Sequence, residues 1–190
     1  MIEIFDDIIP LSVRTAIYTF TANSNYRIVG WHDRSDLELR HKVNLHSNWS
    51  LENLQDSKII PYVEKVLQQS SFKDYTLKDF DQCVINLVKP GDFYYIHTHV
   101  IGTISILYYV NLQWEQNWAG ETLFYKENMK EIEFASPYIP GRFTLFDKEP
   151  HTIRPQSIIG PAFRFTLGIF LRKRQPKKKY EKEKINTRTL

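Results

Sequence analysis

The feature that most constrains the fold is a change in the character of the sequence near residue 80. From there to residue 171, short runs rich in β-branched and aromatic residues follow one another without an intervening helical pattern. Pro and Gly residues separate the runs. The expected strands cover residues 82–88, 93–99, 103–110, 121–126, 132–135, 142–146, 151–154 and 164–171. About eight short strands in succession indicate a jelly-roll sandwich or barrel.

The first 79 residues differ from this pattern and are predicted to be the helical part of the same domain. Residues 10–20 and 58–69 each place apolar side chains mostly on one side of a helix. Residues 26–31 read as a strand, and the polar segment 32–57 is expected to be rich in loops. We therefore expect an α+β domain whose N-terminal helices pack outside a jelly-roll core.

Length and composition agree with one soluble domain over residues 1–172, made of a helical part (1–79) and a β core (80–172). Hydrophobic residues make up 42% of the 190 residues, which excludes a disordered or fibrous protein. Cys83 is the single cysteine, so a disulfide within the chain and a cysteine zinc cluster are excluded, and we expect a packed small hydrophobe. Without a signal peptide or an apolar run of membrane length, the expected location is cytoplasmic, with no membrane partner.

The net charge of +3 conceals an uneven distribution. Residues 172–190 hold nine Lys and Arg but two acids, so this end carries +7 and the rest of the chain carries −4. We expect residues 173–190 to form a flexible basic tail. Such a tail is either a solvated end or a contact for an acidic partner or nucleic acid.

Two histidines in one predicted strand are the first candidates for chemistry. His97 and His99 stand two residues apart, and such side chains point to the same face of a strand. His151, in another predicted strand behind Pro150, can complete a triangle. Three ligands that leave positions open are typical of a catalytic metal site. A polar outer face of a surface strand is the alternative. His32, His41 and His46 lie in the polar segment, where surface roles are expected.

The last predicted strand carries a second signal. Arg164, Thr166 and Gly168 share one face, and apolar side chains share the other. A guanidinium on a compact β face needs a partner, because a buried unpaired cation is costly. A carboxylate ligand suits its planar fork. Pairing with a protein carboxylate such as Asp147, or exposure to solvent, is the alternative.

Several motifs in order then carry a resemblance to a known family. They are IHTH (96–99), LYYVNLQW (107–114), WAGETLFY (118–125), PGRFTLFDKEPHTIRP (140–155) and FRFTLGIFLR (163–172). In order and spacing they resemble the 2-oxoglutarate- and Fe(II)-dependent oxygenases, in particular the prolyl-4-hydroxylase-like branch. FDDIIP (5–10) and the GW-x-D element (30–33) fit the same pattern loosely. The resemblance implies a double-stranded β-helix, which is a jelly-roll fold.

The resemblance also implies residue roles. His97 corresponds to the first iron ligand and His151 to the distal histidine ligand. Arg164 corresponds to the arginine that binds the far carboxylate of 2-oxoglutarate, and Thr166 and Tyr109 match hydroxyl positions that assist it. An ordinary barrel-lining tyrosine is the alternative for Tyr109. Asn111, Trp114, Trp118, Glu121 and Thr122 match segments that shape the barrel and are read first as structural, while Trp118 is also a candidate for the substrate entrance.

The sequence departs from the family at one important position. The family begins its metal motif as H-x-D or H-x-E, whereas this chain has His99 at the third position. If His97 is the first ligand, His99 replaces the acid, and the spacing to Tyr109 favours this register. If His99 is the first ligand, Ile101 takes the place of the acid. A three-histidine set leaves the full charge of Fe(II) uncancelled, which favours anionic co-ligands.

The function implied by the resemblance is hydroxylation of a C–H bond with O2, while 2-oxoglutarate is decarboxylated to succinate. Fe(II) and 2-oxoglutarate are the implied cofactors, ascorbate is a candidate reductant, and no catalytic residue is implied beyond the metal site. The implied substrate is a prolyl or other amino-acid or peptidyl group, or another small molecule. Two alternatives remain: a non-catalytic jelly-roll binding protein, and a three-histidine metalloenzyme that does not use 2-oxoglutarate.

Overall fold

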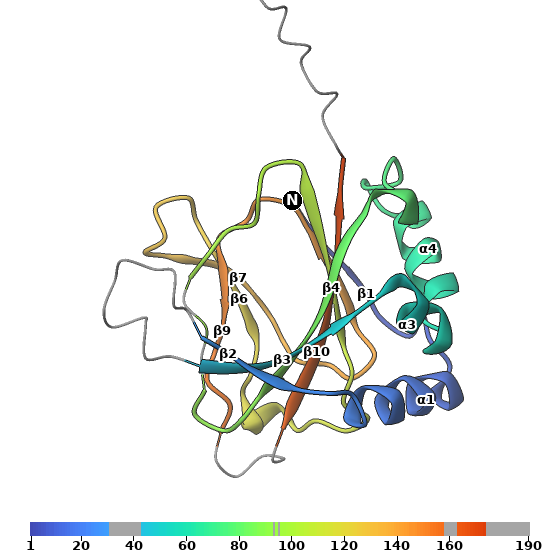
Figure 1. Cartoon of the computed structure of the whole chain (residues 1–190). Coiled ribbons are helices and arrows are strands. Elements are labelled where there is room, and N and C mark those ends of the chain that lie inside the picture. Colours follow the sequence, from blue (N-terminus) through green and yellow to red (C-terminus); the bar gives the residue numbers. More distant parts are fainter. Residues whose placement is uncertain (31–42, 93, 95, 158–162, 174–190) are drawn as a thin grey trace, which may run out of the picture.

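The computed structural model describes residues 1–30, 43–92, 94, 96–157 and 163–173. Figure 1 shows three layers, in which helices cover one face of a large sheet and a smaller sheet faces the other. The helices are α1 (Leu11–Ala22), α3 (Leu51–Asp56) and α4 (Ile60–Gln69), and two short 3-10 turns are η1 (Leu77–Asp79) and η2 (Gln116–Trp118). The expected α+β architecture is confirmed.

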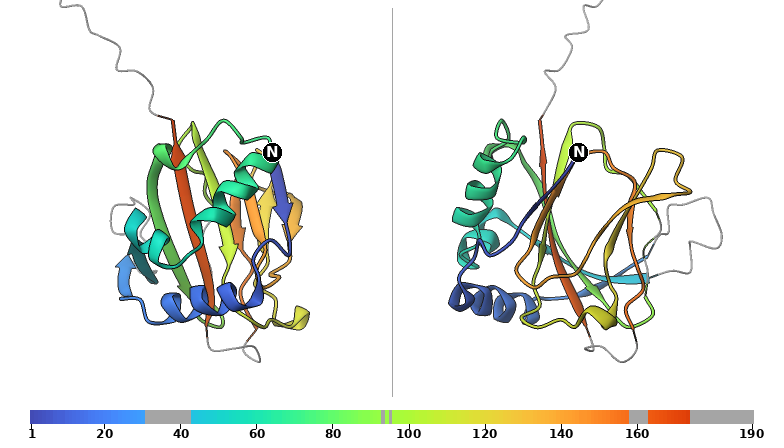
Figure 2. Two further views of the ribbon diagram at one scale, coloured as in Figure 1. Left: turned by 90° about the vertical axis from the view of Figure 1, so that its right-hand side faces the viewer. Right: turned by 180° about the vertical axis from the view of Figure 1, so that it is seen from behind.

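Both sheets are antiparallel, and Figure 2 shows the helices and the smaller sheet on opposite sides of the larger one. The large sheet has the order β1-β8-β5-β10-β4-β3-β2 and the small sheet the order β7-β6-β9. The strands are β1 (Ile2–Phe5), β2 (Arg27–Gly30), β3 (Val43–Trp49), β4 (Phe80–Val88), β5 (Thr103–Tyr109), β6 (Thr122–Tyr125), β7 (Ile132–Ser136), β8 (Phe143–Phe146), β9 (His151–Ile153) and β10 (Arg164–Arg172). This crossing of strands between two facing sheets is the jelly-roll topology expected from the sequence.

The central strand β10 shows how the sequence builds these layers. Phe165, Leu167 and Ile169 belong to the main apolar core beneath the helices. The alternate residues Arg164 and Thr166 line a cavity between the two sheets. Because the helices cover one face of the large sheet and the small sheet lies against the other, both faces of β10 are covered, and its residues are buried from Arg164 to Leu171. The period of two predicted for this strand therefore separates the core from the candidate site.

The N-terminal part is less purely helical than expected. The predicted helices are confirmed as α1 and α4, and the predicted strand as β2, but β1 and β3 also join the large sheet. The expectation of loops over 32–57 is wrong for residues 43–56, which form β3 and α3. Pairing with β4 stabilises the polar β3, and the Ser50 side chain caps α3 in a capping box with Asn53. Residues 32–42 lie outside the described residues.

In the segment 93–99, which the sequence predicts to be a strand, the described residues (94 and 96–99) form a single bridge. His97 pairs with His151 in an isolated antiparallel bridge that continues the small sheet beyond β9. The backbone carbonyl of Tyr94 accepts from the Thr152 hydroxyl, so a side chain takes the place of a backbone partner. The seven other strands predicted after residue 80 are confirmed.

Two further expectations concern single features. Cys83 is buried in the apolar core beneath the helices, as a packed small hydrophobe should be, and burial raises the pKa of its thiol. Among the described residues, the helices are too short or too polar to cross a bilayer. The predicted basic tail falls on residues 173–190, of which the described part is Lys173 alone, whose ammonium lies 4.8 Å from the centre of the Tyr75 ring.

Candidate metal centre

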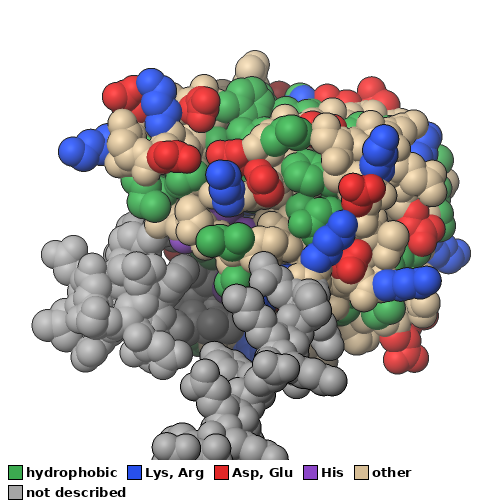
Figure 3. Space-filling view, turned by 90° about the horizontal axis from the view of Figure 1, so that it is seen from above, with side chains coloured by type: hydrophobic (Ala, Val, Ile, Leu, Met, Phe, Trp, Pro, Cys, Tyr) green, Lys and Arg blue, Asp and Glu red, His purple; other side chains and the backbone are tan. Residues whose placement is uncertain are grey.

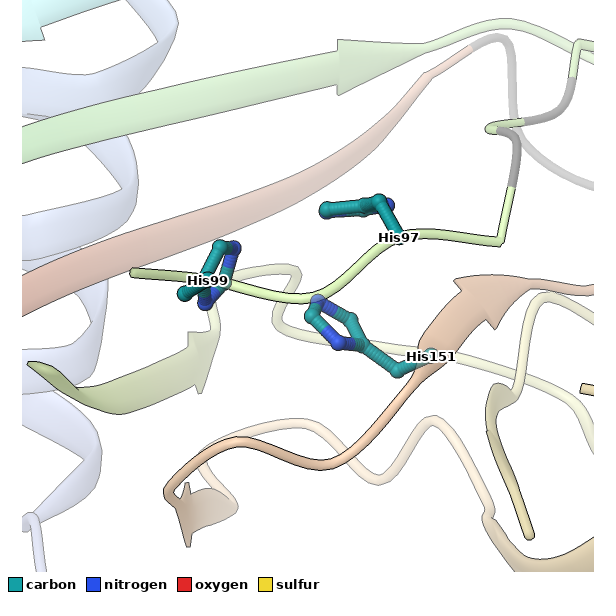
Figure 4. Close-up of side chains that lie close together, drawn as sticks. All are labelled: His97, His99 and His151. Atoms are coloured by element: carbon teal, nitrogen blue, oxygen red, sulfur yellow. The ribbon is translucent and has the colours of Figure 1, made fainter. Parts of the chain in front are cut away.

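The three predicted histidine ligands come together between the sheets. One candidate ligand atom from each of His97, His99 and His151 lies within 4.8 Å of the others. In Figure 4 the ring of His151 points toward the segment that carries His97 and His99. His151 is 6% exposed, the other two are half-buried, and histidine appears in Figure 3 as a small purple area in a recess of the surface. This is the one group of metal-binding type found in the part of the chain that the structure describes.

The backbone and a carbonyl group hold His151 in place. His97 and His151 exchange backbone hydrogen bonds, with N–O distances of 3.1 and 3.0 Å. The Nδ1 of His151 lies 2.9 Å from the carbonyl oxygen of Glu149, which can only accept, so Nδ1 carries the proton. The Nε2 of His151 is then unprotonated and has a lone pair for a metal ion, an arrangement that is usual for metal-binding histidines.

The electrostatics of the cluster keep the rings of His99 and His151 neutral. Burial and the neighbouring His97 lower the pKa of His99 to about 4. Burial, His97 and His99 together hold the pKa of His151 well below its usual range. Neutral imidazole is the form that binds metal ions, because the ring must offer a lone pair. His99 and His151 are therefore in the form that binds a metal cation near neutral pH.

The position of Ile101 distinguishes the two registers of the metal motif. Its side chain is 87% exposed, whereas His99 lies in the cluster with His97 and His151. An outward-facing isoleucine does not stand where a ligand would stand. The geometry therefore favours the register in which His99 replaces the acid.

Arg164 lies at the other end of the same cavity and is fully buried. Its Nε donates to the carbonyl oxygen of Gly120 (2.8 Å), and its Nη1 donates to the hydroxyl of Thr166 (2.5 Å). Its Nη2 is buried without a hydrogen-bond partner. The guanidinium also lies 4.6 Å from the centre of the Tyr138 ring. Burial lowers the pKa of Arg164, yet a guanidinium stays charged at neutral pH.

No protein carboxylate pairs with this arginine among the described residues. Asp147, the alternative partner considered from the sequence, instead accepts from the N-terminal amine of Met1 (2.9 Å). Exposure of Arg164 to solvent is also contradicted, because its exposed fraction is zero. A buried cation with one free donor fits a carboxylate ligand in the cavity.

Gly120 makes room for the arginine. A Cβ atom at this position would lie 3.2 Å from Cδ of Arg164 and 3.1 Å from a ring carbon of Trp114. Its φ of +86° also lies in the region that side chains disfavour. The glycine in the WAGETLFY motif therefore lets the backbone carbonyl approach the guanidinium.

A cavity of about 180 Å3 joins the two ends, with the histidine cluster at one and Arg164 with Thr166 at the other. Among the described residues that line it there is no Asp or Glu. A larger open groove of about 860 Å3 lies between α1, β2, β3 and α3, and its described lining holds no histidine. The smaller cavity is the candidate site because it combines metal-binding side chains with an unpaired cation.

Of the remaining sequence candidates, Thr122 lines this cavity, and the others lie around it. The hydroxyl of Tyr109 donates to Thr122 (2.8 Å), and its ring centre is 5.5 Å from the Arg164 guanidinium. Tyr109 itself is not among the described lining residues, nor is Trp118. Asn111 is structural, because its side-chain oxygen accepts from the backbone N–H of Phe165 (2.8 Å).

Sequence reasoning missed several side chains that line the cavity. His46, expected at the surface, is half-buried on β3, and its Nε2 lies 3.1 Å from the hydroxyl of Tyr94. The reason is that β3 joins the sheet, which turns His46 to the inner face. Asn86 also lines the cavity. The signal for Asn86 was available, since it alternates with the core residues of β4.

Comparisons with known proteins agree with this fold. No protein-family model and no curated protein sequence matches the chain. Among solved structures, a Pseudomonas putida prolyl-4-hydroxylase matches with a TM-score of 0.67 and 14% identity, over 90% of this chain and 92% of that one. A Trichoplax adhaerens prolyl hydroxylase, in complex with a hypoxia inducible factor oxygen degradation domain peptide fragment, matches with a TM-score of 0.66 and 17% identity, over 90% and 83%.

A third structure adds a bound co-substrate. The viral collagen prolyl hydroxylase from Paramecium Bursaria Chlorella virus-1, as a 2-oxoglutarate complex, matches with a TM-score of 0.61 and 12% identity, over 91% of this chain and 96% of that one. At these identities the likeness shows the fold. The chain has the double-stranded β-helix fold of these structures, and the resemblance inferred from the motifs is confirmed at that level.

Proposed function

We propose that this chain is a 2-oxoglutarate-dependent Fe(II) oxygenase that hydroxylates a C–H bond. The observation that carries the proposal is one cavity with two complementary ends, a histidine cluster and a buried arginine with an unpaired donor. A metal cation suits the first end and a carboxylate suits the second. 2-Oxoglutarate is a molecule that can meet both needs, because it carries a metal-chelating 2-oxo acid and a second carboxylate.

The residues then have separate roles. His97, His99 and His151 would hold Fe(II), with Nε2 of His151 directed to the metal by the carbonyl of Glu149. Arg164 would hold the far carboxylate through its free Nη2, while Thr166 fixes Nη1. Tyr109 would act from behind the cavity by ordering Thr122. Trp118 stays a candidate for the substrate entrance.

Bound iron and 2-oxoglutarate supply oxygen activation, in which O2 and the co-substrate are converted to succinate and CO2 while a C–H bond is hydroxylated. The chain contributes position and exclusion of water. The rings of Phe124, Phe146 and Phe170 surround the histidines, at centroid distances from 4.6 to 6.1 Å. Such an apolar shell limits the access of water to the metal.

The proposed substrate is a prolyl or other amino-acid or peptidyl group. The support is the fold shared with three prolyl hydroxylase structures, one of which holds a peptide fragment. Ascorbate is proposed as the reductant that rescues oxidised iron. We also propose that the basic tail contacts an acidic partner or nucleic acid. A protein lacking residues 174–190 should keep its turnover and lose that partner.

The test is an anaerobic titration of the apo-protein with Fe(II) and then with 2-oxoglutarate. A visible charge-transfer band that needs both additions supports the proposal, because it reports chelation of the metal by the co-substrate. Metal binding without the band favours a three-histidine metalloenzyme that does not use 2-oxoglutarate. Absence of metal binding favours a non-catalytic jelly-roll binding protein.

A further inference from the structure

His99, the histidine that stands where the family has an acid, has a contact that no family motif accounts for. The Nδ1 of His99 lies 2.6 Å from the hydroxyl oxygen of Ser105. Ser105 is fully buried on β5, a rigid central strand between β8 and β10. A short hydrogen bond to a buried, strand-borne hydroxyl fixes one nitrogen of the ring in space.

Two aromatic rings restrict the same imidazole. The ring of Phe170 lies edge-on at 4.8 Å, with an angle of 84° between the planes. The ring of Phe146 lies at 6.1 Å and 27°. With these rings beside it and the serine at Nδ1, His99 presents its other nitrogen, Nε2, to the cavity between the sheets. The cluster distances agree, since one ligand atom from each of the three histidines lies within 4.8 Å of the others.

The direction of the Ser105 side chain follows from the alternation of side chains along β5. Ile104 and Ile106 belong to the core beneath the helices, so Ser105 faces the opposite way, toward the site. The position is otherwise suited to an apolar side chain, since every residue of β5 is buried. A serine there costs desolvation of its hydroxyl unless the hydroxyl is hydrogen-bonded, and His99 supplies that bond.

We propose that Ser105 is a positioning residue that makes His99 the third metal ligand. When a metal ion takes the lone pair of Nε2, the proton of His99 is on Nδ1, and the Ser105 oxygen accepts a hydrogen bond from it and holds the ring in that orientation. This is the role that the Glu149 carbonyl has for His151, here performed by a side chain. The inference rests on the metal site of the proposed function, but it does not require 2-oxoglutarate or turnover.

The experiment measures the metal alone, with Co2+ as a spectroscopic probe. Ser105→Ala should weaken Co2+ binding by about 10- to 100-fold, the usual effect of removing a partner of a metal-binding histidine. It should also change the visible absorption of the Co2+ complex, which depends on the number and type of ligands. Ser105→Thr keeps the hydroxyl on a strand that accepts β-branched residues, and it should restore most of the affinity.

A matched control and a double-mutant cycle separate positioning from loss of structure. Ser47→Ala removes another buried serine from the same sheet, outside the cavity, and should leave Co2+ affinity unchanged. In a His99→Ala background, Ser105→Ala should have no further effect on Co2+ affinity, because its partner is already absent. Equal losses in both backgrounds, or wild-type affinity and spectrum in Ser105→Ala, would overturn the inference.

These outcomes distinguish failure of the inference from failure of the oxygenase proposal. If Co2+ binding depends on the Ser105–His99 pair but no charge-transfer band forms with Fe(II) and 2-oxoglutarate, the oxygenase proposal fails and the positioning role stands. If the band forms in the wild type and Ser105→Ala binds Co2+ as well as the wild type does, the oxygenase proposal stands and the positioning role fails. Thermal unfolding of each apo-variant, followed by circular dichroism, confirms that the compared proteins are folded.

Discussion

The two ends of the cavity differ in the charge that would complement them: the histidine end suits a cation and the arginine end suits an anion. At one end, one ligand atom from each of three imidazoles lies within 4.8 Å of the others, and burial with the neighbouring histidines holds the pKa of His99 and His151 below the usual range. At the other end, a buried guanidinium keeps a donor without a partner. Neither arrangement helps the chain to fold, because desolvated polar groups with unused bonding capacity cost free energy. Their pairing in one cavity supports the proposal that a metal cation binds at one end and a carboxylate at the other.

The largest predicted effect is the loss of metal affinity when one histidine is removed. His151→Ala should reduce Fe(II) or Co2+ affinity by roughly 100-fold or more, because a ligand is lost rather than a supporting contact. Isothermal titration with Co2+ measures the change, and His97→Ala should behave alike. His46→Ala is the matched control, since His46 lines the cavity but lies outside the cluster. Wild-type affinity in His151→Ala would refute the ligand set.

Removing the arginine should weaken binding of 2-oxoglutarate rather than binding of the metal. Arg164→Ala should leave Co2+ binding intact and weaken 2-oxoglutarate binding by on the order of 2–5 kcal/mol, the usual cost of removing one partner of a buried charge pair. The charge-transfer band, titrated with 2-oxoglutarate at saturating Fe(II), measures this loss. Arg154→Ala, at a side chain that is 60% exposed, is the matched arginine control. Unchanged 2-oxoglutarate affinity in Arg164→Ala would leave the second end of the cavity without its assigned ligand.

A charge change at the histidine end tests the departure from the family motif. His99→Asp should keep metal binding within about tenfold, because the acid restores the more common ligand type at this position. 2-Oxoglutarate turnover, followed as succinate formation, should be preserved or raised. Loss of metal binding would instead support the register in which Ile101 takes the place of the acid. The exposed position of Ile101 argues for the first outcome.

Much of both ends could be predicted from the sequence because strands impose a period of two. That period placed His97 with His99 and Arg164 with Thr166, and the structure brings each pair into one cavity. The prediction needed only local spacing, together with the motif order that indicated the fold. It held for His97 and His99 even though the strand expected around them is a single bridge.

The supporting contacts could not be predicted because they depend on pairing between distant segments. Ser105 and Glu149 reach their histidines through hydrogen bonds that join different parts of the chain. His46 was misplaced because β3 has few apolar residues, and its pairing with β4 decides its position. Local propensity carries little information on such a strand, since tertiary contacts override it.

The smallest expected effect is a change in how stability depends on pH, which should involve the histidine end of the cavity and not the arginine end. The pKa of His99 is about 4 in the fold, below its ordinary value of 6.5, so between these values the unfolded chain binds a proton that the folded chain does not. The free energy of unfolding therefore falls as the pH drops through this window. In the metal-free protein, His99→Asn should lose fewer degrees of melting temperature between pH 7 and pH 5 than the wild type. Arg164 stays charged throughout, so Arg164→Ala should leave the pH slope unchanged. Identical slopes in the wild type and His99→Asn would show that His99 is not held in its neutral form.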